Sequence, residues 1–157
     1  MSQDYFEQAR GYHAQHPAGK VSLTATKPCQ TQLDLSLAYT PGVGGVCQEI
    51  YDQPTKSWNY TGRGNLVAVV SDGTAILGMG NIGPEAGMPV MEGKSILFKQ
   101  FADINAWPLC LRVPDCPIDS PEYPEQLARM IAALAPSVAS FNLEDVKALS
   151  VLRLWST

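Results

Sequence analysis

The hydrophobic pattern predicts a buried strand near the middle of the chain. Residues 66–70 (LVAVV) are all apolar and mostly β-branched, and such a run beside turn-forming residues is typical of a strand covered on both faces. The next four residues, 71–74 (SDGT), contain Asp-Gly, the dipeptide that favours a hairpin turn. We therefore expect residues 75–77 to return beside this strand as the second arm of a β-hairpin.

Helical periodicity predicts three helices before this strand. They cover residues 2–15, 31–38 and 44–52. The first places Tyr5, Phe6 and Ala9 on one face, and the last follows Pro41, a residue favoured at the start of a helix. Between the first two helices, residues 20–26 alternate apolar and polar side chains. This alternation indicates an exposed strand or an extended arm.

The second half of the chain alternates between helical and strand patterns. The predicted elements are a helix at 89–102, a strand at 107–113, a helix at 120–134 and a strand at 138–141. This alternation is typical of a parallel sheet covered by helices. We therefore predict an α/β fold, with a mostly parallel sheet, helices on both of its faces, a β-hairpin and an N-terminal helical arm.

The composition indicates a globular chain and argues against several functional classes. The 157 residues are 45% hydrophobic and 17% charged, with a formal net charge of −4, which disfavours generic nucleic-acid binding. No apolar run approaches the ~18 residues of a membrane helix, and the acidic start resembles no secretory signal. The four cysteines form no C-x-x-C pair, so we expect free thiols in a reducing, cytoplasmic compartment.

Residues 78–83 (GMGNIG) match the dinucleotide-binding pattern G-x-G-x-x-G. That chemistry needs a helix to begin directly after the glycines, so that its N–H groups meet the pyrophosphate. Residues 84–89 (PEAGMP) contain two prolines, and we expect no helix over this stretch. We interpret the glycines as a turn that lets backbone pack closely, and predict no cofactor-binding residue in this chain.

Four residues are candidates for catalysis or metal binding, and each also has an ordinary structural interpretation. Tyr39 stands where a predicted helix ends, a position usually explained by a buried tyrosine with a hydrogen-bonded hydroxyl. Lys94 lies just inside a predicted helix start, where the helix dipole tends to lower a lysine pKa and favours a base, although most such lysines are simply solvated. Glu144 and Asp145 follow a predicted strand, where carboxylates either bind Mg²⁺ or Mn²⁺ or cap a helix.

Five stretches closely resemble the N-terminal domain of malic enzymes. They are TKP at 26–28, DLSLAYTPGV at 34–43, YTGRGNLVAVVSDGTAILGMGNIG at 60–83, PVMEGK at 89–94 and NLEDVK at 142–147. They occur in the family's order over roughly residues 10–148. Ala75 favours the shorter, bacterial-type branch, because the larger eukaryotic-type enzymes have an arginine at this position.

The resemblance implies oxidative decarboxylation of malate to pyruvate with NAD or NADP and a divalent metal. By this resemblance Lys94 is the general base for the C2 hydroxyl, and Tyr39 is the general acid that protonates C3. Glu144 and Asp145 match two of the family's three ligands for Mg²⁺ or Mn²⁺. The resemblance also implies a homodimer built from N-terminal segments, and the apolar face of the first predicted helix gives an independent reason for it. A second apolar surface is expected near the tail, at Val151, Leu152, Leu154 and Trp155.

The chain also departs from the family pattern. We expect the third metal ligand and the nicotinamide-binding domain to be missing from it, and Asp103 stands where the family has glycine. We assign residues 1–24 to a dimerisation arm, 25–148 to the substrate-side domain and 149–157 to an aberrant tail, and we expect the chain alone to be inactive. Two alternatives stay open: a non-catalytic dimeric remnant or partner-binding fragment, and a fragment of a malolactic-type enzyme.

Overall fold

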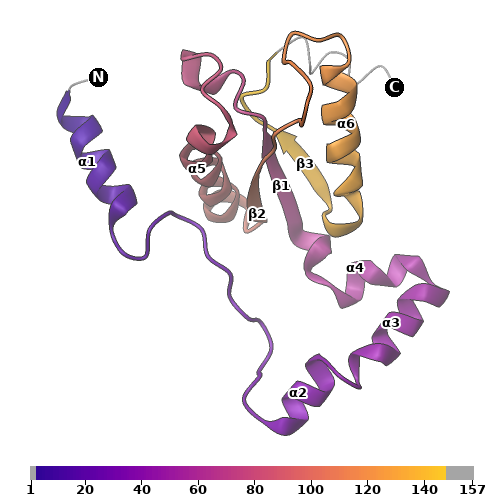
Figure 1. Cartoon of the computed structure of the whole chain (residues 1–157). Helices are drawn as coiled ribbons and strands as arrows, with labels where there is room; N and C mark the ends of the chain where they lie inside the picture. The colour runs from indigo at the N-terminus through magenta and orange to yellow at the C-terminus, as the bar shows by residue number, and fades with distance from the viewer. Residues whose placement is uncertain (1–2, 148–157) are drawn as a thin grey trace. The chain divides into compact units, whose positions relative to one another are not determined.

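A computed structural model describes residues 3–147, which divide into two compact units (Figure 1). The first unit comprises the residues up to 21 and those from 65 onward, and the second comprises 22–64. The first holds α1 (Gln3–Ala14), β1 (Leu66–Ser71), η3 (Ile76–Gly78), α5 (Pro84–Ala102), β2 (Asn105–Cys110), α6 (Tyr123–Ala133), η4 (Ala135–Ser137) and β3 (Ser140–Leu143). The second holds α2 (Gln32–Ala38), α3 (Val43–Asp52), η1 (Pro54–Lys56) and α4 (Ser57–Tyr60), and η2 (Gly62–Asn65) leads out of it.

The three strands form one parallel sheet in the order β2-β1-β3. In this register Val67 of β1 pairs with Ala106 of β2 on one side and with Ser140 of β3 on the other. The chain leaves β1 through α5 to reach β2, and then crosses back through α6 to reach β3. Since parallel crossovers are right-handed, two crossovers in opposite directions put their helices on opposite faces of the sheet. The predicted α/β fold with helices on both faces is confirmed.

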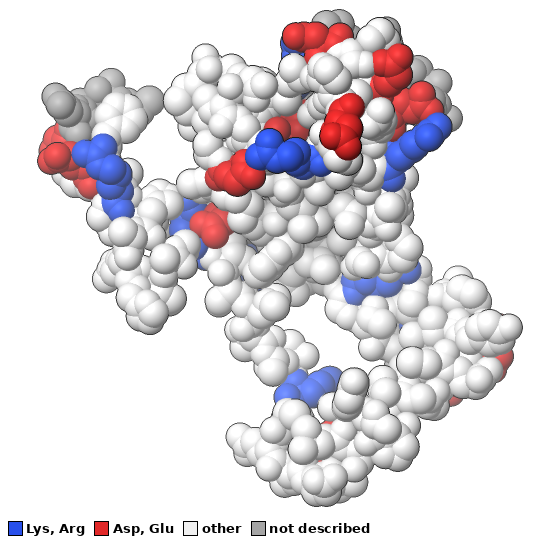
Figure 2. All heavy atoms as spheres, in the orientation of Figure 1, with Lys and Arg blue, Asp and Glu red and all other residues white. Residues whose placement is uncertain are grey.

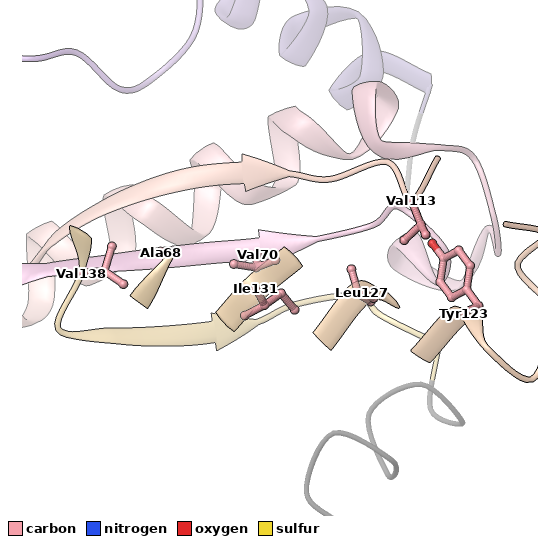
Figure 3. Packing of buried hydrophobic residues seen from close by; sticks show 7 residues of the cluster. All are labelled: Ala68, Val70, Val113, Tyr123, Leu127, Ile131 and Val138. Atoms are coloured by element: carbon pink, nitrogen blue, oxygen red, sulfur yellow. The ribbon is translucent and has the colours of Figure 1, made fainter. Parts of the chain in front are cut away.

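The alternation of side chains along β1 divides the core into two clusters. Ala68 and Val70 face α6, where they meet a cluster that also contains Val113, Tyr123, Leu127, Ile131 and Val138 (Figure 3). Val69 points the other way and packs with Ile76, Met91 and Ala106 beneath α5. Four consecutive residues, from Ala68 to Ser71, have no exposed surface, so β1 is covered on both faces, as its unbroken apolar run predicts.

The predicted β-hairpin after β1 is wrong. Both edges of β1 are already paired, with β2 and β3, so residues 75–77 have no edge left to bind. The Asp72 carboxylate instead accepts hydrogen bonds from the Thr74 backbone N–H at 3.1 Å and from its hydroxyl at 2.6 Å. The Asp72 side chain therefore closes a turn in which Gly73 has φ +74°. The chain then continues into the short helix η3.

The expectation that no helix follows residues 78–83 is also wrong. Helix α5 begins at Pro84, five residues before the predicted start, because proline is well suited to a first helical position. Pro89 lacks the N–H that would bond to the Glu85 carbonyl, and the helix nevertheless continues through it. Met91 and Ser95, which follow Pro89, are buried, and this packing offsets the missing hydrogen bond. A Cβ on Gly87 would lie 2.9 Å from Cδ1 of Ile76, so the glycine lets α5 pack closely on this side chain.

Three other boundaries differ from prediction. Strand β2 begins two residues earlier than expected, and β3 begins two residues later. Helix α6 begins at Tyr123, because Ser120 closes a preceding turn by accepting a hydrogen bond from the Tyr123 N–H through its carbonyl. Residues 20–26 form no strand; they are an extended segment, almost all of it exposed.

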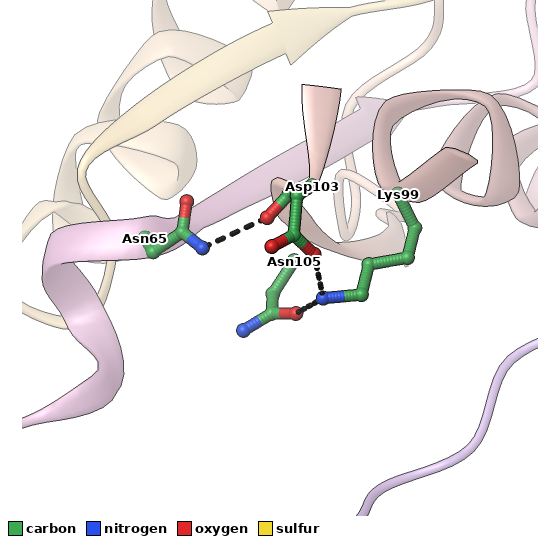
Figure 4. A network of polar contacts seen from close by, with 4 residues as sticks. All are labelled: Asn65, Lys99, Asp103 and Asn105. Atoms are coloured by element: carbon green, nitrogen blue, oxygen red, sulfur yellow. Dashed lines mark hydrogen bonds and ion pairs between the residues drawn. The ribbon is translucent and has the colours of Figure 1, made fainter. Parts of the chain in front are cut away.

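At its C-terminal end α5 stops at Asp103, which adopts the left-handed conformation with φ +52°. The Lys99 ammonium lies 2.5 Å from the Asp103 carboxylate and 3.1 Å from the Asn105 side-chain oxygen (Figure 4). The Asn65 amide donates to the Asp103 backbone carbonyl at 3.0 Å. This network joins the end of α5 to the starts of β1 and β2, at the position where the family resemblance leads one to expect glycine.

The second unit contains helices but no buried residue. Helix α2 begins with a capping box, in which the Thr31 hydroxyl accepts from the Asp34 N–H while the Asp34 carboxylate accepts from the Thr31 N–H. The unit carries three basic and three acidic residues, and its visible surface is mostly uncharged (Figure 2). The helices predicted at 31–38 and 44–52 are therefore confirmed, but as helices without a core of their own.

None of the described helices combines the length and the apolar character that crossing a bilayer requires. The tail residues for which we predicted an apolar surface lie outside the described residues.

Candidate functional site

Glu144 and Asp145 directly follow β3, at the carboxyl end of the sheet. The Glu144 N–H donates to the Val70 carbonyl at 2.9 Å, so the pairing with β1 extends to the first of these residues. The Glu144 carboxylate oxygen Oε2 lies 3.1 Å from Nζ of Lys94 and accepts from the Asn142 amide at 3.1 Å. The structure therefore brings two of the predicted site residues, Lys94 and Glu144, into direct contact.

Lys94 reaches this site from the middle of α5. Since the helix begins at Pro84, Lys94 is its eleventh residue and is not near the start, so the predicted effect of the helix N-terminus does not apply. Its side chain is 34% exposed and that of Glu144 is 24% exposed. Partial burial reduces the screening of such a pair by salt, and it leaves the lysine accessible to a small molecule.

Asp145 has the features of an incomplete cation site. Its Oδ2 is buried and has no hydrogen-bond partner among the described residues. A buried carboxylate oxygen without a donor is costly, and it is the type of atom that Mg²⁺ and Mn²⁺ prefer as a ligand. Asp145 also adopts a left-handed backbone with φ +53°. Its role as a cation ligand together with Glu144 stays a prediction, because the described residues contain no group of three or more His, Cys, Asp or Glu side chains that could hold a metal ion.

The loop after β1 lies against this segment. The Ala75 N–H donates to the Asp145 carbonyl at 3.0 Å, and the Lys147 N–H donates to the Thr74 hydroxyl at 2.8 Å. Thr74 is held by Asp72, which is only 3% exposed. Sequence reasoning missed Asp72, Thr74 and Asn142, although Asp72-Gly-Thr carries the signature of a turn closed by an Asp side chain.

Tyr39 belongs to the second unit, at the corner between α2 and α3. Its backbone N–H donates to the Leu35 carbonyl of α2, and its carbonyl accepts from the N–H of Val43, the first residue of α3. The backbone of Tyr39 is therefore hydrogen-bonded to both helices. The residue is 74% exposed, and the interpretation of Tyr39 as a buried structural tyrosine is therefore wrong. The exposed side chain of Tyr39 is accessible to a ligand.

The four cysteines are free thiols, and two of them, Cys29 and Cys47, are exposed. Burial raises the pKa of the Cys110 thiol to about 11, which makes this residue a poor nucleophile.

Comparison with known proteins identifies the family. A family model described as "Malic enzyme, N-terminal domain" matches residues 18–156. This range includes part of the segment 149–157, which we predicted to depart from the family and which the structure does not describe. The chain is 47% identical over 148 residues to the NADP-dependent malic enzyme of Escherichia coli (strain K12), covering 94% of this chain and 18% of that protein.

Two further relatives agree. The NAD-dependent malic enzyme of Geobacillus stearothermophilus is 47% identical over 133 residues, which cover 85% of this chain and 26% of that protein. The crystal structure of malic enzyme from Pyrococcus horikoshii Ot3 is similar with a TM-score of 0.87 at 40% identity, covering 97% of this chain and 34% of that one. The chain thus spans about a fifth to a third of the length of these relatives. It belongs to the malic enzyme family and corresponds to the N-terminal domain of its members.

Proposed function

We propose that this chain supplies the acid–base residues for metal-dependent oxidative decarboxylation of malate to pyruvate with NAD or NADP. The observation that carries the proposal is the contact of 3.1 Å between Lys94 and Glu144; the next residue, Asp145, has a buried carboxylate oxygen without a partner among the described residues. The names of the relatives, which include both NAD- and NADP-dependent malic enzymes, support this choice of reaction.

In the proposed reaction Lys94 removes the proton from the C2 hydroxyl of malate, and Tyr39 delivers a proton to C3 after carbon dioxide has left. A bound nicotinamide supplies the hydride acceptor, and a bound divalent cation supplies a Lewis acid. Glu144 and Asn142 lie on the proton-accepting side of the site: Glu144 contacts Nζ of Lys94, which accepts the proton as an uncharged amine, and Asn142 restrains the Glu144 carboxylate. Each proton transfer by a positioned group is worth about 10²–10⁴ in rate.

A chimera tests these roles. Residues 10–147 of this chain would replace the matching segment of the Escherichia coli NADP-dependent malic enzyme, and malate-dependent NADPH formation would be measured with Mn²⁺. We expect an active chimera, with Lys94→Ala and Tyr39→Phe each lowering kcat by at least about 100-fold. Lys56→Ala, a lysine of the second unit that pairs with Glu49, serves as the control and should leave kcat unchanged. A chimera that stays active with Lys94→Ala would contradict the proposal.

We further propose that the chain alone does not oxidise malate and binds a divalent cation only weakly. Two adjacent carboxylates leave most of the water shell of Mg²⁺ in place, and the chain spans only part of its relatives. The chain would be assayed with malate, NAD or NADP, and Mn²⁺. Turnover that disappears with Lys94→Ala would refute this expectation.

We also propose a homodimer. Residues 4–14 of α1 are exposed apart from His13, and the apolar residues Tyr5 and Phe6 are 68% and 58% exposed. A two-fold partner that presents the same helix covers such a face in an isologous contact. Analytical ultracentrifugation at tens of micromolar tests this, and a single monomeric species would contradict it. Deleting residues 1–16 should shift the dimer towards monomer, and no shift would place the contact elsewhere.

A further inference from the structure

We propose that Thr74, held in turn by Asp72, is a positioning residue that fixes the segment 144–147 and so presents the carboxylates of Glu144 and Asp145. This inference rests on the proposed function, because it assigns a role to two residues of the same site that do not touch substrate. It concerns the Asp72–Thr74 latch, defined as these two side chains.

In the latch, each hydrogen bond donates towards Asp72: the Lys147 N–H donates to the Thr74 hydroxyl, which donates to the Asp72 carboxylate. The Thr74 hydroxyl donates its hydrogen to Oδ1 of Asp72 at 2.6 Å, which leaves its oxygen lone pairs free to accept from the Lys147 N–H at 2.8 Å. Oδ1 of Asp72 also accepts from the Thr74 N–H, so both the backbone and the side chain of Thr74 are fixed. A hydroxyl that donates to a carboxylate becomes a better acceptor, which strengthens the bond to Lys147.

Asp72 is itself anchored in the core. Its Oδ2 accepts from the Tyr123 hydroxyl at 3.1 Å, and Asp72 and Tyr123 are 3% and 6% exposed. Burial, together with the neighbouring Asp72 carboxylate, raises the pKa of the Tyr123 hydroxyl, so this group stays protonated and remains a donor. Tyr123 begins α6 and belongs to the cluster in Figure 3, and the latch therefore rests on the packed face of the sheet.

The segment that the latch holds carries unfavourable features that need support. Asp145 has a left-handed backbone and a buried carboxylate oxygen without a partner, and both cost free energy. Three main-chain bonds restrain the segment: Glu144 N–H to Val70, Ala75 N–H to the Asp145 carbonyl, and Lys147 N–H to Thr74. Only the last of these bonds depends on a side chain, so it can be removed by substitution without breaking the sheet.

The test compares Thr74→Val with Thr74→Ser in the full 157-residue chain. Valine keeps the shape of threonine but has no hydroxyl, whereas serine keeps the hydroxyl. Amide hydrogen exchange followed by NMR reports the bond directly: we expect exchange at Lys147 to accelerate about tenfold in Thr74→Val and to return to the wild-type rate in Thr74→Ser. Ser95→Ala, which removes another buried hydroxyl, from α5, is the matched control and should leave Lys147 unchanged.

A second readout measures positioning. Mn²⁺ added at low concentration broadens the NMR signals of residues near its binding site, even when binding is weak. We expect broadening at residues 144–147 in the wild-type chain, a reduction of about 10–100-fold in Mn²⁺ affinity in Thr74→Val, and recovery in Thr74→Ser. If Thr74→Val does not fold, Tyr123→Phe takes its place, because it removes one of the hydrogen bonds to Asp72 and keeps the packing of the ring.

Each outcome has a defined meaning. Unchanged exchange at Lys147 in Thr74→Val overturns the latch. Faster exchange with unchanged Mn²⁺ broadening overturns its positioning role. Absence of broadening in the wild-type chain contradicts the proposed cation binding instead, and the exchange rates then decide the latch by themselves.

Discussion

The two units of this chain are stabilised in different ways. In the sheet unit, β1 lies between two helices, and the side chains from Ala68 to Ser71 are completely buried. In the second unit no residue of 22–64 is buried, and its leucines and aromatic residues are exposed, among them Leu37 at 64% and Tyr51 at 81%. Tertiary packing therefore holds the first unit, whereas caps and local hydrogen bonds hold the helices of the second.

The two proposed proton-transfer groups, Lys94 and Tyr39, stand on elements that are stabilised in these different ways. Lys94 stands on a 19-residue helix that packs on the sheet, and Tyr39 stands at the corner of two short helices without a core. Helices this short are marginal in water unless tertiary contacts support them. Within this chain, tertiary packing therefore supports the element that carries Lys94, whereas only caps and local hydrogen bonds support the element that carries Tyr39.

The largest expected effect on the free energy of unfolding comes from truncating a leucine in the sheet unit, compared with the same truncation in the second unit. Leu127→Ala removes a fully buried side chain from the cluster beneath α6, and should lower the free energy of unfolding by about 2–5 kcal/mol. Leu37→Ala removes an exposed side chain and should change it by less than about 0.5 kcal/mol. Urea unfolding at low protein concentration measures both values. Equal decreases in the free energy of unfolding would show that the second unit has a core, and would contradict the difference between the two units.

A smaller effect is expected from the cap of α2. Thr31→Ala removes the side chain that accepts from the Asp34 N–H, which should destabilise this helix by about 1 kcal/mol. Amide exchange should become faster in α2 and stay unchanged in α6. Thr31→Ser, which keeps the hydroxyl, is the control. If exchange in both helices accelerates equally, the two units unfold together.

Acid should loosen the same cap. Backbone N–H groups of Gln30 and Thr31 donate to the Asp34 carboxylate and lower its pKa below the usual range. Because the pKa is lower in the folded state, the stabilisation is complete above the ordinary aspartate pKa and is lost as the pH falls through the folded value. Circular dichroism between pH 5 and pH 2 should show a loss of helix that is smaller in Asp34→Asn. An identical acid profile in that variant would remove Asp34 from the explanation.

The smallest expected effect concerns Asp103 at the end of α5 (Figure 4). Glycine adopts the left-handed conformation without steric cost, whereas Asp103 compensates part of that cost through Lys99. We expect the order of thermal stability to be Asp103→Gly above wild type, and wild type above Asp103→Ala. Thermal unfolding ranks the three proteins, and a wild type more stable than Asp103→Gly would mean that the ion pair outweighs the backbone strain.

Part of the candidate site can be predicted because its residues lie at places that sequence patterns mark. Glu144 and Asp145 follow a predicted strand, and carboxyl ends of parallel strands are where polar groups gather. The family resemblance predicts the role of Lys94, whereas the prediction from its helix position is wrong, because α5 begins at Pro84 and not at Pro89. The roles of Lys94, Tyr39, Glu144 and Asp145 remain predictions.

The sequence by itself determined the buried strand β1, the helices before and after it and the alternation of helix and strand, because hydrophobic periodicity and prolines act locally. Tertiary structure decided that residues 75–77 do not return as the second arm of a β-hairpin. Asp-Gly favours a hairpin only when the strand has a free edge, and β2 and β3 occupy both edges of β1. The same applies to Asp72 and Thr74: their hydrogen bonds to Tyr123 and Lys147 join residues 51 and 73 positions apart, a proximity that only the parallel sheet produces.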